Sequence, residues 1–150
     1  SPFNAWVLLK GIETLQIRIE KAQQNAAKLA DWLAGKPKLK KVLYPFRKDH
    51  PQYELAKRQM KGGSTLLSFE AEGGREGAFR FANALRLIRI SNNLGDVKSL
   101  IVHPGTTTHQ RFTPEARAEM GIGEGLLRLS VGLEHPEDLF EDLSRGLAVV

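Results

Sequence analysis

Arg128 lies in the middle of a short apolar stretch near the end of the chain, residues 126–131. Alternate residues of a strand point to opposite faces, so we expect Leu127, Leu129 and Val131 on one face and Leu126, Arg128 and Ser130 on the other. A guanidinium held in this way presents a planar fork of donors that suits a carboxylate or a phosphate. The same spacing also fits an arginine on a solvated sheet face.

A helix predicted directly after this strand would hold Arg128 from behind. Gly132 to His135 turn the chain, Pro136 suits a first helical position, and Glu137 and Asp138 suit the positive end of a helix. Apolar residues then recur at helical spacing, namely Leu139, Phe140, Leu143 and Leu147. We therefore expect this helix to pack on the sheet and to fix the strand.

Two polar loops are the other candidate sites, residues 91–96 and 103–111. Each follows a predicted strand, and asparagine and glycine in such loops can contact a ligand, although both loops also read as ordinary turns with local hydrogen bonds. His103 and His109 are six residues apart with no acidic or thiol partner between them, so we predict no metal site. No nucleophile elbow or phosphate loop is present, and we assign no catalytic residue.

The length and composition of the chain are those of one ordinary globular domain. The chain has 150 residues, of which 41% are hydrophobic and 26% charged. No apolar run reaches the roughly 20 residues that span a bilayer, and we see no secretion signal, so no membrane partner is expected. Cysteine is absent, which rules out disulfides and thiol nucleophiles and favours a reducing compartment. We infer a cytoplasmic location.

The positive charge is concentrated in one region. The net charge is +5, and the excess of lysine and arginine falls between residues 36 and 61. The aromatics there, Tyr44, Phe46 and Tyr53, form no stacking motif, and no nucleic-acid signature occurs. A solvated basic face is the favoured interpretation, and we expect no nucleic-acid partner.

The first 35 residues predict an unusually long helix. Its apolar stripe is spaced by fours and threes through Leu8, Ile12, Leu15, Ile19, Ala22, Ala26, Leu29 and Leu33. Continuous from Pro2 to Ala34, it would extend roughly 50 Å, more than a small domain can cover. We therefore divide the chain into a linking helix, residues 1–35, and a small domain, residues 36–150. Phe3, Trp6 and Val7 are expected to pack on polypeptide outside this sequence.

The small domain is predicted to be α+β, with an open, mostly antiparallel sheet covered by helices on one side. We expect strands at 41–44, 64–70, 87–91, 99–103 and 126–131. One helix is expected at 52–60, and a short one is expected to be capped at Thr113 and to end at Gly121. Another helix is expected after Gly73-Gly74, and its apolar face would consist of Ala78, Phe79, Ala82 and Leu85.

Five stretches together resemble the pyridoxal-phosphate enzymes of cysteine and methionine metabolism. They are Ser-Pro-Phe-Asn-Ala-Trp (1–6), His-Pro-Gln-Tyr-Glu-Leu-Ala-Lys-Arg-Gln-Met (50–60), Leu-Gly-Asp (94–96), His-Pro-Gly-Thr-Thr-Thr-His (103–109) and Gly-Leu-Leu-Arg-Leu-Ser-Val-Gly-Leu-Glu (125–134). Within this family, the stretch around Asn92 and the triple threonine are most similar to the sulfhydrylases that act on O-succinylhomoserine.

The resemblance implies a fold, a site and a reaction. The fold would be the small C-terminal domain of a fold-type-I transferase, and Arg128 would bind the substrate's α-carboxylate. Asn93 stands where family members commonly have a serine close to the substrate, and Asn92 occupies a position that varies with reaction type. The implied reaction is γ-replacement of succinate by sulfide. Cystathionine γ-synthase and methionine γ-lyase activities, or a non-enzymatic binding or oligomerisation domain, are the alternatives.

The resemblance also implies what lies elsewhere. The lysine that binds pyridoxal 5'-phosphate would lie in a large domain upstream of residue 1. The cofactor would therefore be held by that missing N-terminal domain, and this piece alone is expected to be inactive. Family members are usually homotetramers, and their substrates are small amino acids.

Overall fold

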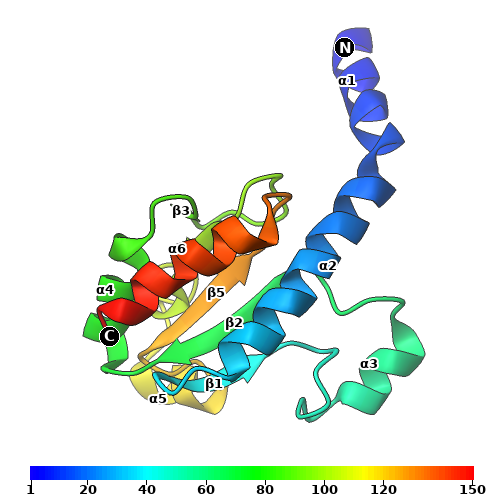
Figure 1. Cartoon of the computed structure of the whole chain (residues 1–150). Coiled ribbons are helices and arrows are strands. Elements are labelled where there is room, and N and C mark those ends of the chain that lie inside the picture. Colours follow the sequence, from blue (N-terminus) through cyan, green and yellow to red (C-terminus); the bar gives the residue numbers. More distant parts are fainter.

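The computed structural model describes residues 1–150 (Figure 1). The helices are α1 (Pro2–Glu13), α2 (Leu15–Ala34), α3 (Tyr53–Gln59), α4 (Gly74–Ala84), α5 (Pro114–Glu119) and α6 (Pro136–Ala148), with a 3-10 turn η1 (Pro104–Thr106). The strands are β1 (Leu39–Leu43), β2 (Leu66–Ala71), β3 (Arg89–Ile90), β4 (Leu100–Val102) and β5 (Leu126–Ser130).

The five strands form one sheet in the order β1-β2-β5-β4-β3. Every neighbouring pair is antiparallel except β3 and β4, which are parallel. This confirms the predicted α+β class and places β5, the strand of Arg128, at the centre. In the register, Ser68 of β2 and Val102 of β4 lie directly opposite Arg128. These three side chains therefore share one face of the sheet.

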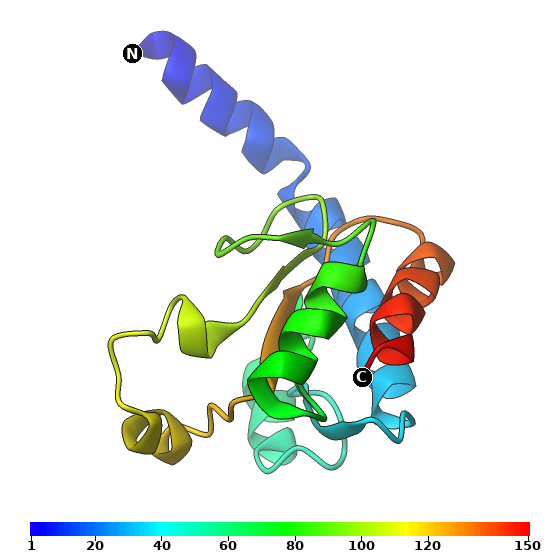
Figure 2. The ribbon, with the colours of Figure 1, turned by 90° about the vertical axis from the view of Figure 1, so that its left-hand side faces the viewer.

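Helices α2, α4 and α6 cover the other face, as predicted (Figure 2). The core forms where Leu29 of α2, Phe81 of α4 and Leu139 of α6 meet the sheet, and each is fully buried. The Phe69 and Phe81 rings pack with their centroids 5.1 Å apart. Each fully buried side chain of this size contributes roughly 1.5–3 kcal/mol to folding, so the helix layer supports β5 from behind.

The predicted single helix is wrong in one respect, because it is interrupted at Thr14. Thr14 has φ −108° and ψ 7°, outside the helical range. Gly11 and the β-branched Thr14 both weaken a helix. The guanidinium of Arg18 then donates to the Gly11 carbonyl and the Thr14 hydroxyl, and so caps the break. Figure 1 shows the resulting bend between α1 and α2.

Other details also differ from prediction. Phe79 was expected on the apolar face of α4, but its side chain is 39% exposed and Phe81 occupies the core instead. The buried face of α4 is Gly77, Ala78 and Phe81, because α6 packs against that side. Strand β3 has only two residues, shorter than the predicted strand 87–91, and both are exposed. It lies at the edge of the sheet and pairs with β4 alone.

The start of β2 is fixed by Tyr44. Ser64 has φ 91°, which lies outside the strand region, so β2 begins at Leu66 and not at residue 64. The buried Tyr44 hydroxyl donates to the Ser64 carbonyl at 3.0 Å. Burial, together with the nearby charge of Asp31, raises the pKa of Tyr44 to about 12. The hydroxyl therefore keeps its proton and the bond.

Helix α1 extends away from the domain (Figure 1) and buries none of its residues. Its apolar side chains are exposed, including Phe3, Trp6, Val7, Leu8, Leu9 and Ile12. The second half of α2, by contrast, contributes Ala22, Asn25, Ala26, Leu29, Ala30 and Leu33 to the buried interior. None of the helices combines the length and apolar character required to cross a membrane.

Candidate functional site

Arg128 occupies the sheet face opposite the helices. The predicted alternation is confirmed, since Leu127, Leu129 and Val131 are buried at 0, 0 and 1% exposure and pack in the core. Arg128 itself is partly exposed. Strand β5 is paired with antiparallel strands on both sides, so the backbone that carries the Arg128 side chain is fixed.

The guanidinium of Arg128 reaches the first polar loop. Its Nη2 donates to the backbone carbonyls of Asn92 at 3.0 Å and Asn93 at 3.4 Å. Nε is buried and has no partner, and Nη1 makes no hydrogen bond within the chain. A buried donor without a partner costs about 1–3 kcal/mol. Nη2 is therefore anchored, Nε is enclosed, and Nη1 is the donor left for an acceptor from outside the chain.

Asn92 and Asn93 contribute to this site through their backbones. Their carbonyls orient the Arg128 fork, whereas neither side-chain amide forms a hydrogen bond within the chain. Both residues are exposed. The structure thus brings the three predicted site residues together, and the two side-chain amides have no partner within the chain.

A polar network near this loop joins the start of β4 to the end of β5. The Glu134 carboxylate accepts from the Ser99 N–H at 2.6 Å and from the Ser99 hydroxyl at 2.9 Å. The Ser99 hydroxyl in turn accepts from the Gly132 N–H at 2.9 Å. Asn25 of α2 donates to the carbonyls of Gly132 and Glu134. This network ties α2 to the strands that carry the site.

Gly132 is required at the centre of this network. A Cβ there would lie 2.4 Å from the Val97 carbonyl oxygen and 2.6 Å from the Lys98 carbonyl carbon. Both are backbone atoms, so any side chain would displace the segment that follows the Asn92-Asn93 loop. We did not predict this network. Asn25, next to the apolar stripe of the long helix, was the one visible signal.

The second polar loop forms a separate cluster. His103 is buried, its Nε2 lies 2.9 Å from the Glu124 carbonyl and its Nδ1 lies 2.9 Å from the Thr106 hydroxyl. A carbonyl can only accept, so Nε2 carries a proton. The Phe79 ring packs edge-on against the imidazole, which accounts for the position of Phe79. These contacts assign His103 to a structural role.

Charged groups complete that cluster. The buried Arg117 donates to the Phe112 carbonyl and to the Glu124 carboxylate, at 2.8 and 2.9 Å. Hydrogen bonds from Arg117 and then Arg75 hold the pKa of Glu124 below its usual range. His109 bonds Thr108 instead of joining His103. No group of three metal-binding side chains is present, and no hydrogen bond joins this loop to the Arg128 guanidinium.

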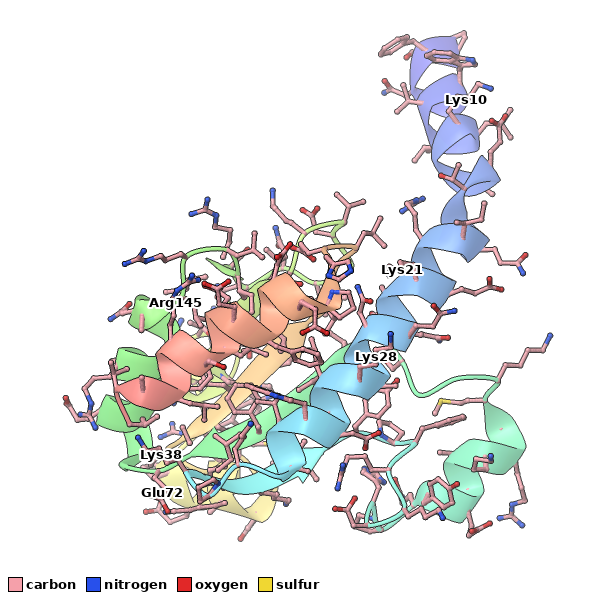
Figure 3. All side chains as sticks on the ribbon, in the orientation of Figure 1. Lys10, Lys21, Lys28, Lys38, Glu72 and Arg145 are labelled. Carbon is pink, nitrogen blue, oxygen red and sulfur yellow. The ribbon has the colours of Figure 1, made fainter.

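Much of the basic region between residues 36 and 61 is engaged within the molecule. Lys36 lies 4.0 Å above the Trp32 ring, Lys38 donates to the Leu147 carbonyl, and Arg47 bridges Asp31 and Asp49. Figure 3 shows Lys38 beside the C-terminal helix, whereas Lys10, Lys21 and Lys28 are spread along α1 and α2. These cations are distributed over several elements.

Similarity of sequence, together with the α+β fold, places this domain in a class, the pyridoxal-phosphate-dependent enzymes. The sequence model of the Cys/Met metabolism PLP-dependent enzymes matches residues 1–148. The chain therefore belongs to that family, which confirms the resemblance found in its motifs. The family includes enzymes of γ-replacement and γ-elimination and depends on pyridoxal phosphate.

Curated relatives and solved structures agree with this assignment. The chain is 49% identical over 150 residues to O-succinylhomoserine sulfhydrylase from Pseudomonas aeruginosa, covering 100% of this chain and 37% of the relative. It is 45% identical to L-methionine gamma-lyase from Porphyromonas gingivalis, covering 98% and 37%. Cystathionine gamma synthase from Xanthomonas oryzae pv. oryzae, solved with aminoacrylate and cysteine, superposes with a TM-score of 0.92 at 44% identity, covering 99% and 38%. The chain thus spans little more than a third of each of these proteins.

Proposed function

We propose that this chain binds the α-carboxylate of an amino-acid substrate through Arg128, as part of a pyridoxal-phosphate enzyme that catalyses γ-replacement. The observation that carries the proposal is the state of the guanidinium. Its Nη2 is anchored on two loop carbonyls, while the buried Nε has no partner and Nη1 is unbonded. A carboxylate can accept charge-assisted hydrogen bonds at the Nη1 end of the guanidinium while Nη2 stays anchored.

The residues around Arg128 fit a substrate carboxylate and not the cofactor itself. Its neighbours across the sheet are Ser68 and Val102, and its acceptors are backbone carbonyls. These groups offer no amine for a covalent link to an aldehyde cofactor. We propose that pyridoxal phosphate is held in the part of the whole protein that corresponds to the remaining length of the relatives. When bound, the cofactor withdraws electrons from the substrate's α-carbon.

The role of this chain is then orientation. A substrate gripped by its carboxylate has one end fixed, so the bonds to be broken can stand correctly against the cofactor ring. Asn92 and Asn93 belong to the loop that holds the Arg128 guanidinium, and their side-chain amides have no partner within the chain. We propose that Asn93 contacts the substrate and that Asn92 influences which reaction follows.

O-Succinylhomoserine is the proposed substrate and sulfide the proposed nucleophile, with homocysteine and succinate as products. Support comes from the O-succinylhomoserine sulfhydrylase relative at 49% identity. The methionine gamma-lyase relative, at 45% identity, supports γ-elimination from methionine as the second candidate. Arg128 would serve both reactions, since both substrates carry the same α-carboxylate.

An assay of the purified whole protein with pyridoxal phosphate decides between these candidates. We expect homocysteine and succinate to form from O-succinylhomoserine and sulfide at least tenfold faster than methanethiol forms from methionine. Faster methanethiol formation would assign the protein to the elimination branch. If neither activity is measurable, the remaining candidates are cystathionine γ-synthase activity and a non-enzymatic binding or oligomerisation domain.

Helix α1 is proposed to pack on the remainder of the whole protein, within a homotetramer. The helix is apolar around its circumference and buries none of its residues, and a helix of that kind is normally enclosed. Trp6→Cys in the whole protein should react with a thiol reagent at least tenfold more slowly than Glu72→Cys, which lies on the exposed surface of the small domain. Equal rates would show that α1 is free.

A further inference from the structure

The loop that orients Arg128 is itself exposed and contains little regular structure. Residues 92–98 are all exposed, yet the carbonyls of Asn92 and Asn93 are the acceptors that hold Nη2. An exposed loop can fix a guanidinium only if the loop is held in turn. The contacts between this loop and the sheet therefore decide how well Arg128 is oriented.

Ser130 makes the contact at the centre of the loop. Its hydroxyl oxygen accepts a hydrogen bond from the Gly95 N–H at 2.9 Å. Gly95 has φ +77°, a conformation that favours glycine. The other bonds to the sheet and its flanks lie at the ends of the loop, from the Ser91 N–H to the Ile101 carbonyl and from the Leu133 N–H to the Val97 carbonyl.

Ser130 and Arg128 lie on the same face of β5, two residues apart. The strand thus supplies both the fork and the hydroxyl that holds the loop whose carbonyls orient the fork. Ser130 is 1% exposed and lies in register between Leu66 and Leu100. Because it is buried, its hydroxyl is removed from direct contact with a ligand.

We infer that Ser130 is a positioning residue for the substrate carboxylate, acting through the Gly95 N–H and the Asn92-Asn93 carbonyls on Arg128. The inference rests on the proposed function of Arg128. Without the hydroxyl, the centre of the loop loses its side-chain anchor and Nη2 loses its fixed acceptors. The fork then samples other orientations, so substrate binding weakens, while the chemical step on correctly bound substrate keeps its rate.

Steady-state kinetics of the whole holoenzyme test this inference. Ser130→Ala should raise KM for the amino-acid substrate about fivefold to tenfold, the value of one ordinary hydrogen bond, with kcat within twofold. In an Arg128→Ala background, the same substitution should change KM by less than twofold, because Ser130 acts through Arg128. Ser144→Ala, which removes an exposed hydroxyl from α6, should leave both constants unchanged.

The possible outcomes separate the two claims. If Ser130→Ala leaves KM unchanged, or lowers kcat alone, the positioning role is wrong. It is also wrong if the increase in KM is equally large in the Arg128→Ala background, since that indicates a general structural effect. If Arg128→Ala by itself leaves KM unchanged, the proposed carboxylate site fails, and the inference about Ser130 fails with it.

Discussion

Replacing Arg128 with alanine in the whole holoenzyme should raise KM for the amino-acid substrate about 100-fold. The expected loss is about 2.7 kcal/mol, within the range for removing one member of a hydrogen-bonded charge pair. The side chain lies at the centre of β5 with its Nη2 anchored and its Nε buried without a partner. Steady-state measurement of kcat and KM with the proposed substrate provides the test.

Two controls make this prediction specific. Arg128→Lys keeps the charge but loses the planar fork, so KM should rise about tenfold. Arg58→Ala removes an exposed cation from α3 and should leave KM unchanged. A carboxamide analogue of the substrate should be processed about equally poorly by the parent enzyme and by Arg128→Ala. A large difference between them on this analogue would argue against carboxylate binding.

Replacing Asp142 with alanine should destabilise the protein by about 3 kcal/mol, because buried N–H groups would lose their acceptor. Asp142 is fully buried in α6. Its carboxylate accepts from the N–H groups of Arg86, Leu87 and Ile88 at 2.8, 3.0 and 2.9 Å, and from Arg145 at 2.9 Å. These bonds fix the segment that leads into β3. Denaturant unfolding monitored by circular dichroism measures the change.

Glu141→Ala is the matched control, since Glu141 is the exposed neighbour that also pairs with Arg145. Exposed ion pairs contribute about 0–1 kcal/mol, so this variant should differ little from the parent. An equal loss of stability in both variants would contradict the assigned role of Asp142.

The Asp142 contribution should also depend on pH. Burial alone would raise the pKa of this carboxyl, but the N–H donors of Ile88, Arg86 and Leu87, with Arg145, outweigh it and hold the pKa below its usual range. A carboxyl with a lowered folded-state pKa stabilises the protein above its unfolded value, about 3.9. That stabilisation is lost as pH falls through the folded value. The difference between parent and Asp142→Ala should therefore shrink below about pH 4.

The sequence predicts the parts of this fold that depend on local periodicity. Alternation around Arg128 identifies which residues of β5 pack in the core beneath the helices, because a strand packed on a core places apolar residues at every second position. The spacing of Leu139 and Leu143 likewise identifies the helix behind it. Thr113 was correctly predicted to cap α5, and its hydroxyl accepts from the Ala116 N–H.

Periodicity fails where distant segments decide the outcome. The choice of Phe81 over Phe79 depends on where α6 packs. The acceptors of Arg128 are backbone carbonyls, which every residue possesses, so no side-chain pattern marks them. Residue type and spacing could suggest a functional arginine but could not identify the loop that orients it.

The fold and family were predictable because several motifs keep their order along the whole chain. The separate motifs at 1–6, 94–96, 103–109 and 125–134 are far apart in sequence, yet the family assignment extends over residues 1–148. The motifs at 94–96 and 103–109 make different contacts in the structure. Gly95 contacts the strand of Arg128 through Ser130, whereas His103 fixes a neighbouring loop through Glu124.

A crystal structure of the whole holoenzyme with a bound amino-acid substrate analogue tests the central claim most directly. We predict that both carboxylate oxygens lie within about 3.2 Å of Arg128 guanidinium nitrogens, with Nη2 still bonded to the loop carbonyls. A carboxylate bound by another cation, with Arg128 unengaged, would contradict the proposed site.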